Sequence, residues 1–279
     1  MKYIHETFDS ITKLLETINK RVPNSVFKGK ALDSETGSQK FTGTKNYKEA
    51  EELLINGWDG PVKDIKAAQK ALQVKSNVTT QKARPRSSVV GYAACVPAAI
   101  LGLPESMIAT EKVPNKVKAV TIVYANNANC GVNSDRFVKA GAAVLKLVND
   151  LELKGYRVRL ICEVFSAKAS NETIVCRVTV KDWRQPLDLK KIAFPIAHAS
   201  MLRRLGFRWL ETVSGIEYKG WPSGYGYPLS NDLTCQQINE LYRKNNLLND
   251  NEYYINMKQV EADDYDTEAI AKSVGMTLK

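Results

Sequence analysis

A chain of 279 residues, 44% of them hydrophobic and 25% charged, has the composition of an ordinary globular protein and can bury a large core without disulfides. Its five scattered cysteines form no CxxC pair and only two histidines accompany them, which argues against a secreted disulfide framework and against a zinc site. The excess of 40 Lys and Arg over 30 Asp and Glu gives a formal charge of +10, which favours an anionic partner, although such a surplus also serves solubility alone.

Residues 1–13 contain no apolar leader, and the longest apolar run, Val96 to Leu103, is too short to cross a bilayer. The motifs GxxxxGK[ST], GxGxxG, HExxH and GxSxG, each typical of a particular cofactor or reaction, do not occur. We therefore expect a cytoplasmic protein with reduced thiols, no cofactor and no membrane partner. The oligomeric state is left open.

Residues 1–76 are predicted to form a helical N-terminal region. Apolar residues recur at helical spacing from Phe8 to Ile18 and predict a short amphipathic helix. A second helix, which Thr44 or Asn46 can cap, is expected to end at Gly57.

A polar stretch, residues 75–86, is predicted to be an exposed connection. It contains a small basic cluster beside Pro85, formed by Lys82, Arg84 and Arg86. Such a cluster binds nucleic acid or simply remains hydrated. Residues 89–107 are apolar but broken by glycines and prolines, so we expect short strands or turns that pack on the main core.

The clearest pattern begins with a β-branched run from Lys118 to Tyr124, typical of a strand that is buried on both faces. A polar loop and a helix that Ser134 can cap come next. Two alternating segments, 156–165 and 172–180, then predict a hairpin. The remaining elements are expected to be a helix from Asp188 that is interrupted at Pro195, a glycine-rich loop at 220–228, a helix from Thr234, a strand at 253–257 and a helix at 267–274.

This order of strand, loop, long helix, hairpin and helix resembles the first half of a von Willebrand factor A (vWA) domain. The resemblance covers about one third of the chain, and other doubly wound folds share most of the order. The predicted fold class is therefore α/β: a vWA-like or Rossmann-like mixed sheet flanked by helices. It would span residues 87–279 with insertions and follow the helical N-terminal region.

The vWA resemblance implies a magnesium site just after the first strand, where an Asp and two hydroxyl side chains follow the pattern Asp-x-Ser-x-Ser. This chain has Ala125-Asn-Asn-Ala-Asn-Cys130 at that place, with no carboxylate before Asp135. Because hard cations prefer charged oxygen ligands, we expect the metal site to be lost. The alternative is a metal held jointly by Asn126, Ser134 and Asp135.

Two further segments are similar to an uncharacterised protein family encoded by bacteriophages and prophages. The first is Phe41 to Ala50 with Asn56-Gly-Trp58, and the second is Ala193 to Trp209. This resemblance implies a phage context, and hence the host-cell cytoplasm, but no established activity.

The segment from Phe194 to Trp209 is chemically the most unusual. His198 and Ser200 are the beginning of a nucleophilic pair, but residues two apart on a helix do not face each other. Three arginines in the same segment could instead grip a phosphate or a partner: Arg203, Arg204 and Arg208. The plainer interpretation is a helix that starts at Pro195, with His198 bonded locally.

The hairpin register predicts a second basic feature. If Val158 and Leu160 face the core, four arginines come together on the other sheet face and at the strand end: Arg157, Arg159, Arg177 and Arg184. They could follow a phosphate backbone, or they could be a solvated edge that charge protects from aggregation. In the loop at 220–228, the aromatic residues Trp221, Tyr225 and Tyr227 could stack on bases or pin the loop to the core.

We are left with three hypotheses. The leading one is a non-enzymatic, phage-type binding protein in which a degenerate vWA-like domain binds nucleic acid or an acidic protein surface, of phage or host, in an assembly. The first alternative is a metal-dependent or hydrolytic enzyme that uses Asp135 or His198. The second is a virion structural or assembly protein.

Overall fold

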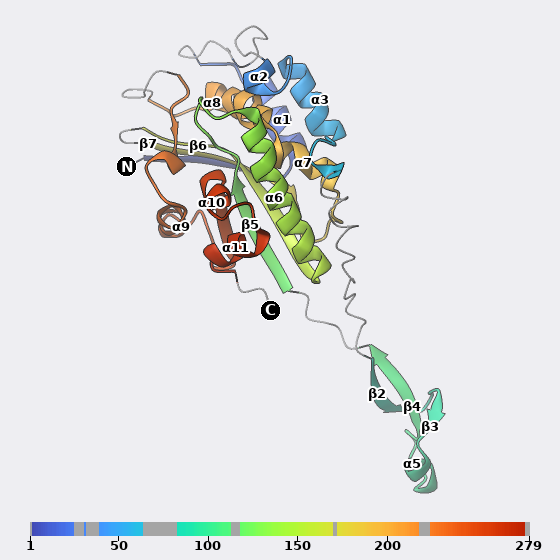
Figure 1. Ribbon diagram of the computed structural model, residues 1–279. Helices are drawn as coiled ribbons and strands as arrows, with labels where there is room; N and C mark the ends of the chain where they lie inside the picture. Colours follow the sequence, from blue (N-terminus) through green and yellow to red (C-terminus); the bar gives the residue numbers. More distant parts are fainter. Residues whose placement is uncertain are drawn as a thin grey trace.

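The computed structural model describes residues 2–24, 31, 39–63, 83–112, 118–169, 172–217 and 224–276. Its main sheet carries strands in the order β1-β7-β6-β5-β9, with a short β8 beside β6 (Figure 1). These strands are β1 (Lys2–Phe8), β5 (Lys118–Ala125), β6 (Tyr156–Ala169), β7 (Glu172–Lys181), β8 (Tyr227–Pro228) and β9 (Glu252–Asn256). Strands β5, β6 and β9 are parallel, β7 is antiparallel to β6, and β1 is parallel to β7. The predicted mixed α/β sheet is thereby confirmed.

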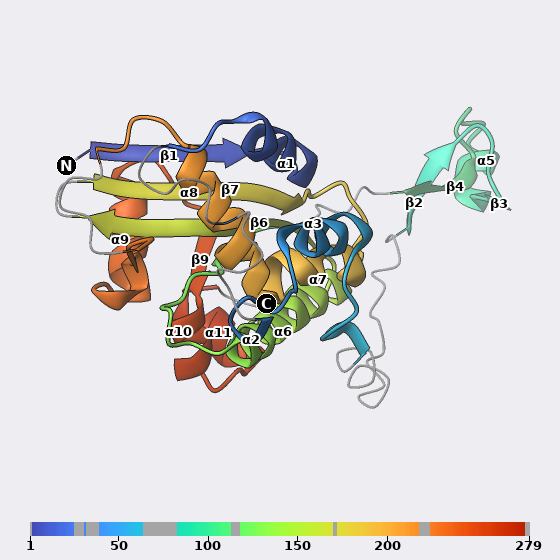
Figure 2. The same cartoon turned by 90° about the horizontal axis from the view of Figure 1, so that it is seen from above.

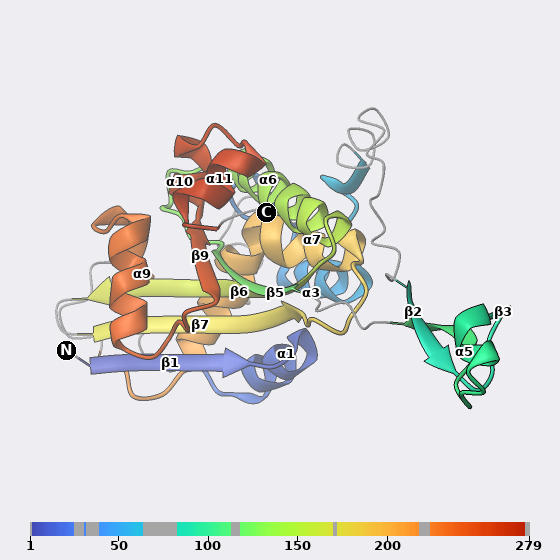
Figure 3. The same ribbon diagram turned by 90° about the horizontal axis from the view of Figure 1, so that it is seen from below.

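Helices cover both faces of this sheet (Figures 2 and 3). The larger core cluster joins one face to α1 (Ile11–Lys20), α3 (Tyr47–Asn56), α6 (Ser134–Leu153), α7 (Leu189–Ala197) and α8 (Phe207–Thr212). The opposite face is covered by α9 (Cys235–Lys244). Two short helices, α10 (Met257–Ala262) and α11 (Thr267–Ser273), pack against α6.

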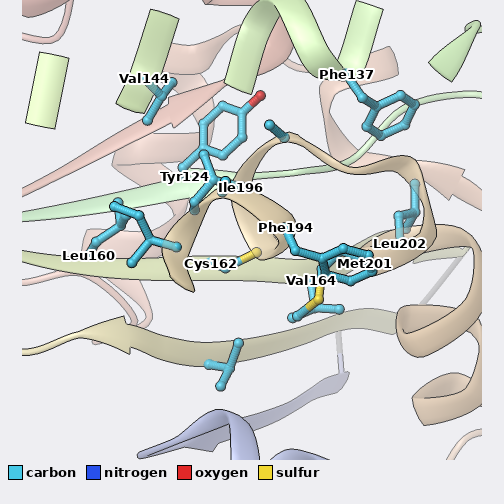
Figure 4. Packing of buried hydrophobic residues seen from close by; sticks show 14 of the residues in the cluster. Tyr124, Phe137, Val144, Leu160, Cys162, Val164, Phe194, Ile196, Met201 and Leu202 are labelled. Carbon is cyan, nitrogen blue, oxygen red and sulfur yellow. The ribbon is translucent and has the colours of Figure 1, made fainter. Parts of the chain in front are cut away.

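Strand β5 is the centre of the fold. Its residues Val120 to Ala125 are all buried, as the continuous β-branched run predicts for a strand with layers on both sides. On one side, Tyr124 meets Val144 of α6, Leu160 and Cys162 of β6, and Ile196 of α7 (Figure 4).

Local capping explains where several helices begin. The Asn46 side chain accepts a hydrogen bond from Glu49 N at 2.8 Å and starts α3. Thr234 and Gln237 form a reciprocal capping box at the start of α9, and Asp188 accepts from Lys190 N and Lys191 N before α7. These starts agree with the sequence prediction. At α6, by contrast, Ser134 is already the first helical residue rather than the cap.

The crossing of α6 and α7 depends on Gly141. A Cβ atom at this position would lie 2.3 Å from Ala197 Cα and 2.7 Å from Ile196 O. Glycine therefore allows the backbones of two helices to approach more closely than any other residue would.

The N-terminal segment differs from the sequence prediction. The helix expected at residues 8–18 is α1, which begins only at Ile11. Residues Lys2 to Phe8 form a strand instead, which pairs with β7. Ser10 caps α1, so the apolar Phe8 belongs to the strand. The predicted helix therefore began too early, because the helical spacing of apolar residues includes Phe8, which is the last residue of β1. Helix α3 packs against α7, so the two predicted parts of the chain are in contact. Their division into a region 1–76 and a domain 87–279 stays a prediction.

Residues 83–112 form a small unit of their own and do not pack on the main core as predicted. A three-stranded sheet in the order β2-β4-β3 contains β2 (Ala83–Ser88), β3 (Ala93–Ala94) and β4 (Met107–Lys112), and α5 (Val96–Ile100) follows β3. In Figures 1 to 3 this small unit lies apart from the rest of the protein. None of its described apolar side chains is buried, so the expectation that they pack on the main core was wrong.

Among the helices of the described ranges, none combines the length and the apolar character that a membrane span requires.

Candidate functional site

A cavity of about 530 Å³ lies at the carboxyl ends of β5 and β6. The chain leaves β5 through α6 and returns as β6 on one side, while β9 flanks β5 on the other. In open α/β sheets, ligands bind outside the carboxyl ends of the strands, which is where this cavity lies. The residues that line this cavity include Phe41, Thr42, Asn127, Asn129, Arg203, Arg204, Phe207, Tyr225 and Tyr227.

Buried amides fix the loop after β5, which forms one wall of the cavity. Asn126 Nδ2 donates to Pro195 O and to His198 O, each at 3.2 Å. Asn127 Nδ2 donates to Ser166 Oγ at 3.1 Å, and its Oδ1 accepts from Ser166 N at 3.3 Å. The asparagines of this loop therefore tie β5 to α7 and β6.

Arg203 and Arg204 also line the cavity, in a π-helical segment, Met201–Gly206, that precedes α8. Such segments are rare and occur often at functional sites. The Arg203 guanidinium donates to three backbone oxygens, those of Phe41, Asn129 and Val132. It also lies 3.9 Å from the centre of the Phe41 ring. Burial lowers the pKa of Arg203 to about 10.

Arg204 is held by Thr42, the last residue of α2 (Gln39–Thr42), and by Thr44, which lies two residues further on. Its Nε donates to Thr44 Oγ1 at 2.8 Å, and its Nη2 donates to Thr44 O at 3.0 Å and to Thr42 Oγ1 at 3.3 Å. Burial lowers the pKa of Arg204, and the charge of Glu49 opposes this effect.

Neither guanidinium is neutralised by a neighbouring acid. Arg203 is 3% exposed and Arg204 is 2% exposed, yet no carboxylate of the described residues lies within 4.0 Å of either one. Their hydrogen-bond partners are carbonyl and hydroxyl groups, and Arg203 also lies over the Phe41 and Phe137 rings. Since an uncompensated buried cation is unfavourable, the cavity wall is a place where an anion would be stabilised.

Aromatic rings complete the cavity. Phe207 and Tyr225 stack with their centroids 3.9 Å apart and their planes at 5°. Tyr225 OH donates to Glu211 Oε1 at 2.7 Å, and burial together with this bond raises the pKa of Tyr225. Tyr227 is 54% exposed at the rim. The cavity thus combines fixed cations with flat apolar surfaces.

His198 and Ser200 do not form the nucleophilic pair that the sequence allowed as a candidate. His198 Nδ1 accepts from the backbone N of Ser200 at 3.1 Å. The Ser200 hydroxyl instead donates to Thr42 O at 2.6 Å and lies 2.8 Å from Thr44 Oγ1. His198 is the extended residue that ends α7, and its local bond agrees with one part of the plainer interpretation. The other part was wrong, because α7 starts at Leu189 and runs through Pro195 to Ala197, so the helix neither starts nor is interrupted at Pro195.

The three candidate metal ligands do not come together. Asn126 is buried with its amide nitrogen bonded to two carbonyls, whereas Asp135 is exposed on the first turn of α6. Ser134 Oγ donates to Lys40 O at 3.4 Å. In the described ranges, no three His, Cys, Asp or Glu side chains gather at one point. This donor set does not fit a hard cation.

The predicted open arginine face is covered at its centre. Arg177 is buried under α9, where its guanidinium lies 3.0 Å from Glu163 Oε2 and 4.6 Å from the centre of the Tyr242 ring. Tyr242 OH donates to Glu163 Oε1 at 3.0 Å. A free Arg177 was therefore a wrong expectation, because a helix that follows some 60 residues later covers its face.

The remaining candidate arginines are dispersed. Arg159 lies over the Trp183 ring at 5.1 Å, Arg157 is exposed 4.0 Å from Glu152 Oε2, and Arg184 is exposed. Arg208 is buried and donates to Arg21 O at 3.1 Å, so it does not face the cavity. Arg86 is exposed on the small unit, 3.9 Å from Glu111 Oε1. Lys82, Trp221 and the side chain of Arg84 lie outside the described residues.

Sequence reasoning missed the residues that build the site around the arginines. Thr42 and Thr44 carry no chemical signature of their own. A usable signal existed, because they belong to one of the two segments quoted for the phage-family resemblance and Arg204 belongs to the other. In the structure these segments are in contact, although about 160 residues separate them.

Residues 2–278 match the model of a family that is described as a domain of unknown function, DUF7192. No curated protein and no solved structure matches the chain. The match covers nearly the whole chain, from β1 to the end of α11 and beyond. The protein therefore belongs to the DUF7192 family.

Proposed function

We propose that this chain is a non-enzymatic binding protein that holds single-stranded nucleic acid in the cavity at the carboxyl ends of β5 and β6. The observation that carries the proposal is the pair Arg203 and Arg204, two buried cations on the cavity wall without a carboxylate partner among the described residues. A phosphate would supply the missing negative charge through charge-assisted hydrogen bonds.

The donor geometry leaves room for such a ligand. Arg204 uses Nε and Nη2 in its bonds to Thr42 and Thr44, whereas its Nη1 donates to no described residue. The bonds that Arg204 makes also fix its orientation. A phosphate would therefore meet a pre-positioned donor, which reduces the entropy that is lost on binding.

The aromatic residues of the cavity favour a ligand that carries a base over a bare phosphate, because a base can stack on their rings. Stacking on a ring is tolerant of sequence and stabilises each bound base by about 1–3 kcal/mol. Tyr227 at the rim is exposed enough to stack, and the Phe207–Tyr225 pair offers a second flat surface. A cavity of about 530 Å³ lies within the usual range for small-molecule sites and can hold one nucleotide.

Neither alternative gains a comparable observation from this site. The hydroxyl of Ser200 is bonded to the Thr42–Thr44 segment, and the ligand set of Asp135 is not assembled. The phage context, the vWA-like relationship and the cytoplasmic location stay proposals that rest on sequence. The order β5, α6, β6, β7 supports the vWA-like part.

Binding is best measured by fluorescence anisotropy with a labelled oligothymidylate across a series of salt concentrations. Arg204→Gln keeps hydrogen-bond donors but removes the charge. We expect it to weaken binding at least about tenfold and to lower the salt slope by about 0.7, the value for one phosphate contact on a single strand. Tyr227→Ala should weaken binding about tenfold and leave the salt slope unchanged, because it removes only stacking.

Matched controls separate the cavity from general surface charge. Arg157→Gln removes an exposed arginine from the other sheet face, and Trp183→Ala removes an exposed aromatic residue that does not line the cavity. Both should bind like the wild type. No binding by the wild type would refute the proposal, as would a loss in Arg157→Gln that a folded Arg204→Gln does not share. If Arg204→Gln does not fold, Tyr227→Ala still decides the outcome.

A further inference from the structure

The small unit, residues 83–112, cannot owe its structure to a core of its own. No described side chain between residues 85 and 111 is buried. The backbone hydrogen bonds described for this unit, such as Tyr92 N to Ile108 O at 2.9 Å and Cys95 N to Ser106 O at 2.7 Å, stay within it. A sheet this small is marginal in water unless its apolar side packs against something else.

The apolar side chains of the small unit form an exposed surface. Ile100 is 80% exposed, Val90 78% and Leu101 74%. The other large apolar residues exposed there are Val89, Tyr92, Val96 and Leu103. Single exposed apolar residues are normal, but a concentration of this kind marks an interaction surface.

The absence of charge from most of the small unit indicates what kind of partner its surface fits. From Ser87 to Pro104 the chain contains no charged residue, although the whole chain carries a formal charge of +10. Nucleic acid is held mainly through its phosphates and would find no cation on this surface. An acidic protein would not be selected either. The partner must therefore present another uncharged apolar surface.

We propose that this surface packs against the same surface of a second copy of the chain. Two bodies of equal positive charge repel each other, so a contact between copies is easiest where the chain is uncharged and stands apart from the body (Figures 1 and 3). An uncharged apolar patch is complementary to itself, as a two-fold interface requires. Stable interfaces bury about 800 Å² on each partner, and the seven large exposed side chains would form the apolar centre of such a contact.

This contact does not depend on the nucleic-acid proposal, and it would leave both cavities accessible. The small unit contributes none of the residues that line the cavity. A dimer formed in this way presents two binding sites on one particle.

Sedimentation velocity of the full chain tests the contact. We expect the wild type to sediment as a dimer, and the double variant Ile100→Asp with Leu101→Asp to sediment as a monomer with unchanged near-ultraviolet circular dichroism. The control is Val22→Asp with Ile55→Asp, which adds the same charges at exposed apolar residues of the body and should stay dimeric. A monomeric wild type, or a dimer that survives the two aspartates in the small unit, overturns the proposal.

Crosslinking shows whether the two copies meet unit to unit. In a background with Cys95→Ser and Cys130→Ser, the remaining cysteines are buried. Oxidation should then join two copies of Ile100→Cys through a disulfide, whereas Val22→Cys, which is also exposed, should stay uncrosslinked. Equal crosslinking at both positions contradicts the proposal. Flotation of a monomeric wild type with phosphatidylcholine vesicles would identify lipid as the occupant instead.

Discussion

His198 shows how a buried side chain can set the pH dependence of the whole fold. Its ring stacks on Phe194 with centroids 4.6 Å apart and meets the edge of Trp58 at 4.7 Å. Burial among these rings lowers the pKa of His198 to about 4 from a usual value of 6.5. The folded protein therefore holds a neutral imidazole at neutral pH, and Nδ1 serves as the acceptor for Ser200 N.

The sign of the resulting effect on stability follows from proton linkage. Between pH 6.5 and pH 4, the unfolded chain binds a proton at His198 and the folded chain does not. The contribution of this residue is complete above pH 6.5 and is lost as the pH falls toward 4. We expect the free energy of unfolding to drop by about 2 kcal/mol between pH 7 and pH 5 through His198 alone.

Chemical denaturation of the wild type and of His198→Asn at several pH values isolates this term. The asparagine oxygen can replace Nδ1 as an acceptor but does not titrate in this range. The variant should be less stable at pH 7, with a pH slope reduced by the His198 contribution. His5→Asn is the control for the same replacement at an exposed histidine. Equal slopes for wild type and His198→Asn would show that the ring protonates in the folded state.

At the scale of elements, the α6–α7 crossing makes an unusual demand on a helix interior. Alanine is normally preferred over glycine there by about 1 kcal/mol. At Gly141 the preference should reverse, because a Cβ would overlap Ala197 Cα at 2.3 Å. We expect Gly141→Ala to lower the free energy of unfolding by about 1–3 kcal/mol, the cost of overpacking.

Urea denaturation compares this variant with Gly131→Ala, whose added Cβ meets nothing within 4 Å. The control should change stability by less than about 0.5 kcal/mol. Stabilisation by Gly141→Ala would mean that helix propensity outweighs the contact and that the two helices can move apart.

The elements also show which patterns a sequence can reveal. Strand β5, helix α6 and the β6–β7 hairpin were predicted because their β-branched run and their alternation are local features that burial on the sheet preserves. Strand β1 escaped prediction because an edge strand needs few apolar residues, and Phe8 also fits the period of the following helix. The burial of Arg177 was hidden because α9, which covers it, comes much later in the chain.

The candidate site was predictable only in part, for the same reason. Arg203 and Arg204 were identified as anion candidates from their charge. Their dependence on Thr42, Thr44 and Phe41 was not, because hydrogen bonds across 160 residues leave no periodicity in a single sequence. Arg204 lines the cavity and Arg208 does not. The sequence could not separate them, because it did not predict the π-helical segment that contains Arg204.

At the scale of the whole molecule, the body and the small unit should be energetically separate. No described hydrogen bond or ion pair joins residues 83–112 to the body. Replacing these residues by a short Gly-Ser linker should therefore leave the stability of the body within about 0.5 kcal/mol of the wild type.

The measurement is urea denaturation at a protein concentration low enough for both chains to be monomeric, with tryptophan fluorescence as the signal. All four tryptophans, among them Trp58 and Trp209, lie outside residues 83–112, so the signal reports the body alone. A loss of several kcal/mol would show that the small unit supports the body directly.

The pairing of β1 with β7 imposes an order on folding during synthesis. Lys2 lies opposite Glu172 and Phe8 opposite Val178, so β1 leaves the ribosome long before its partner strand exists. Closing a loop of this length costs conformational entropy before the new contacts can offset it. The hairpin of β6 and β7, by contrast, closes over a few residues. The sheet should thus grow outward from its hairpin, and β1 should dock last, on an edge of β7 that stays open to other strands until then.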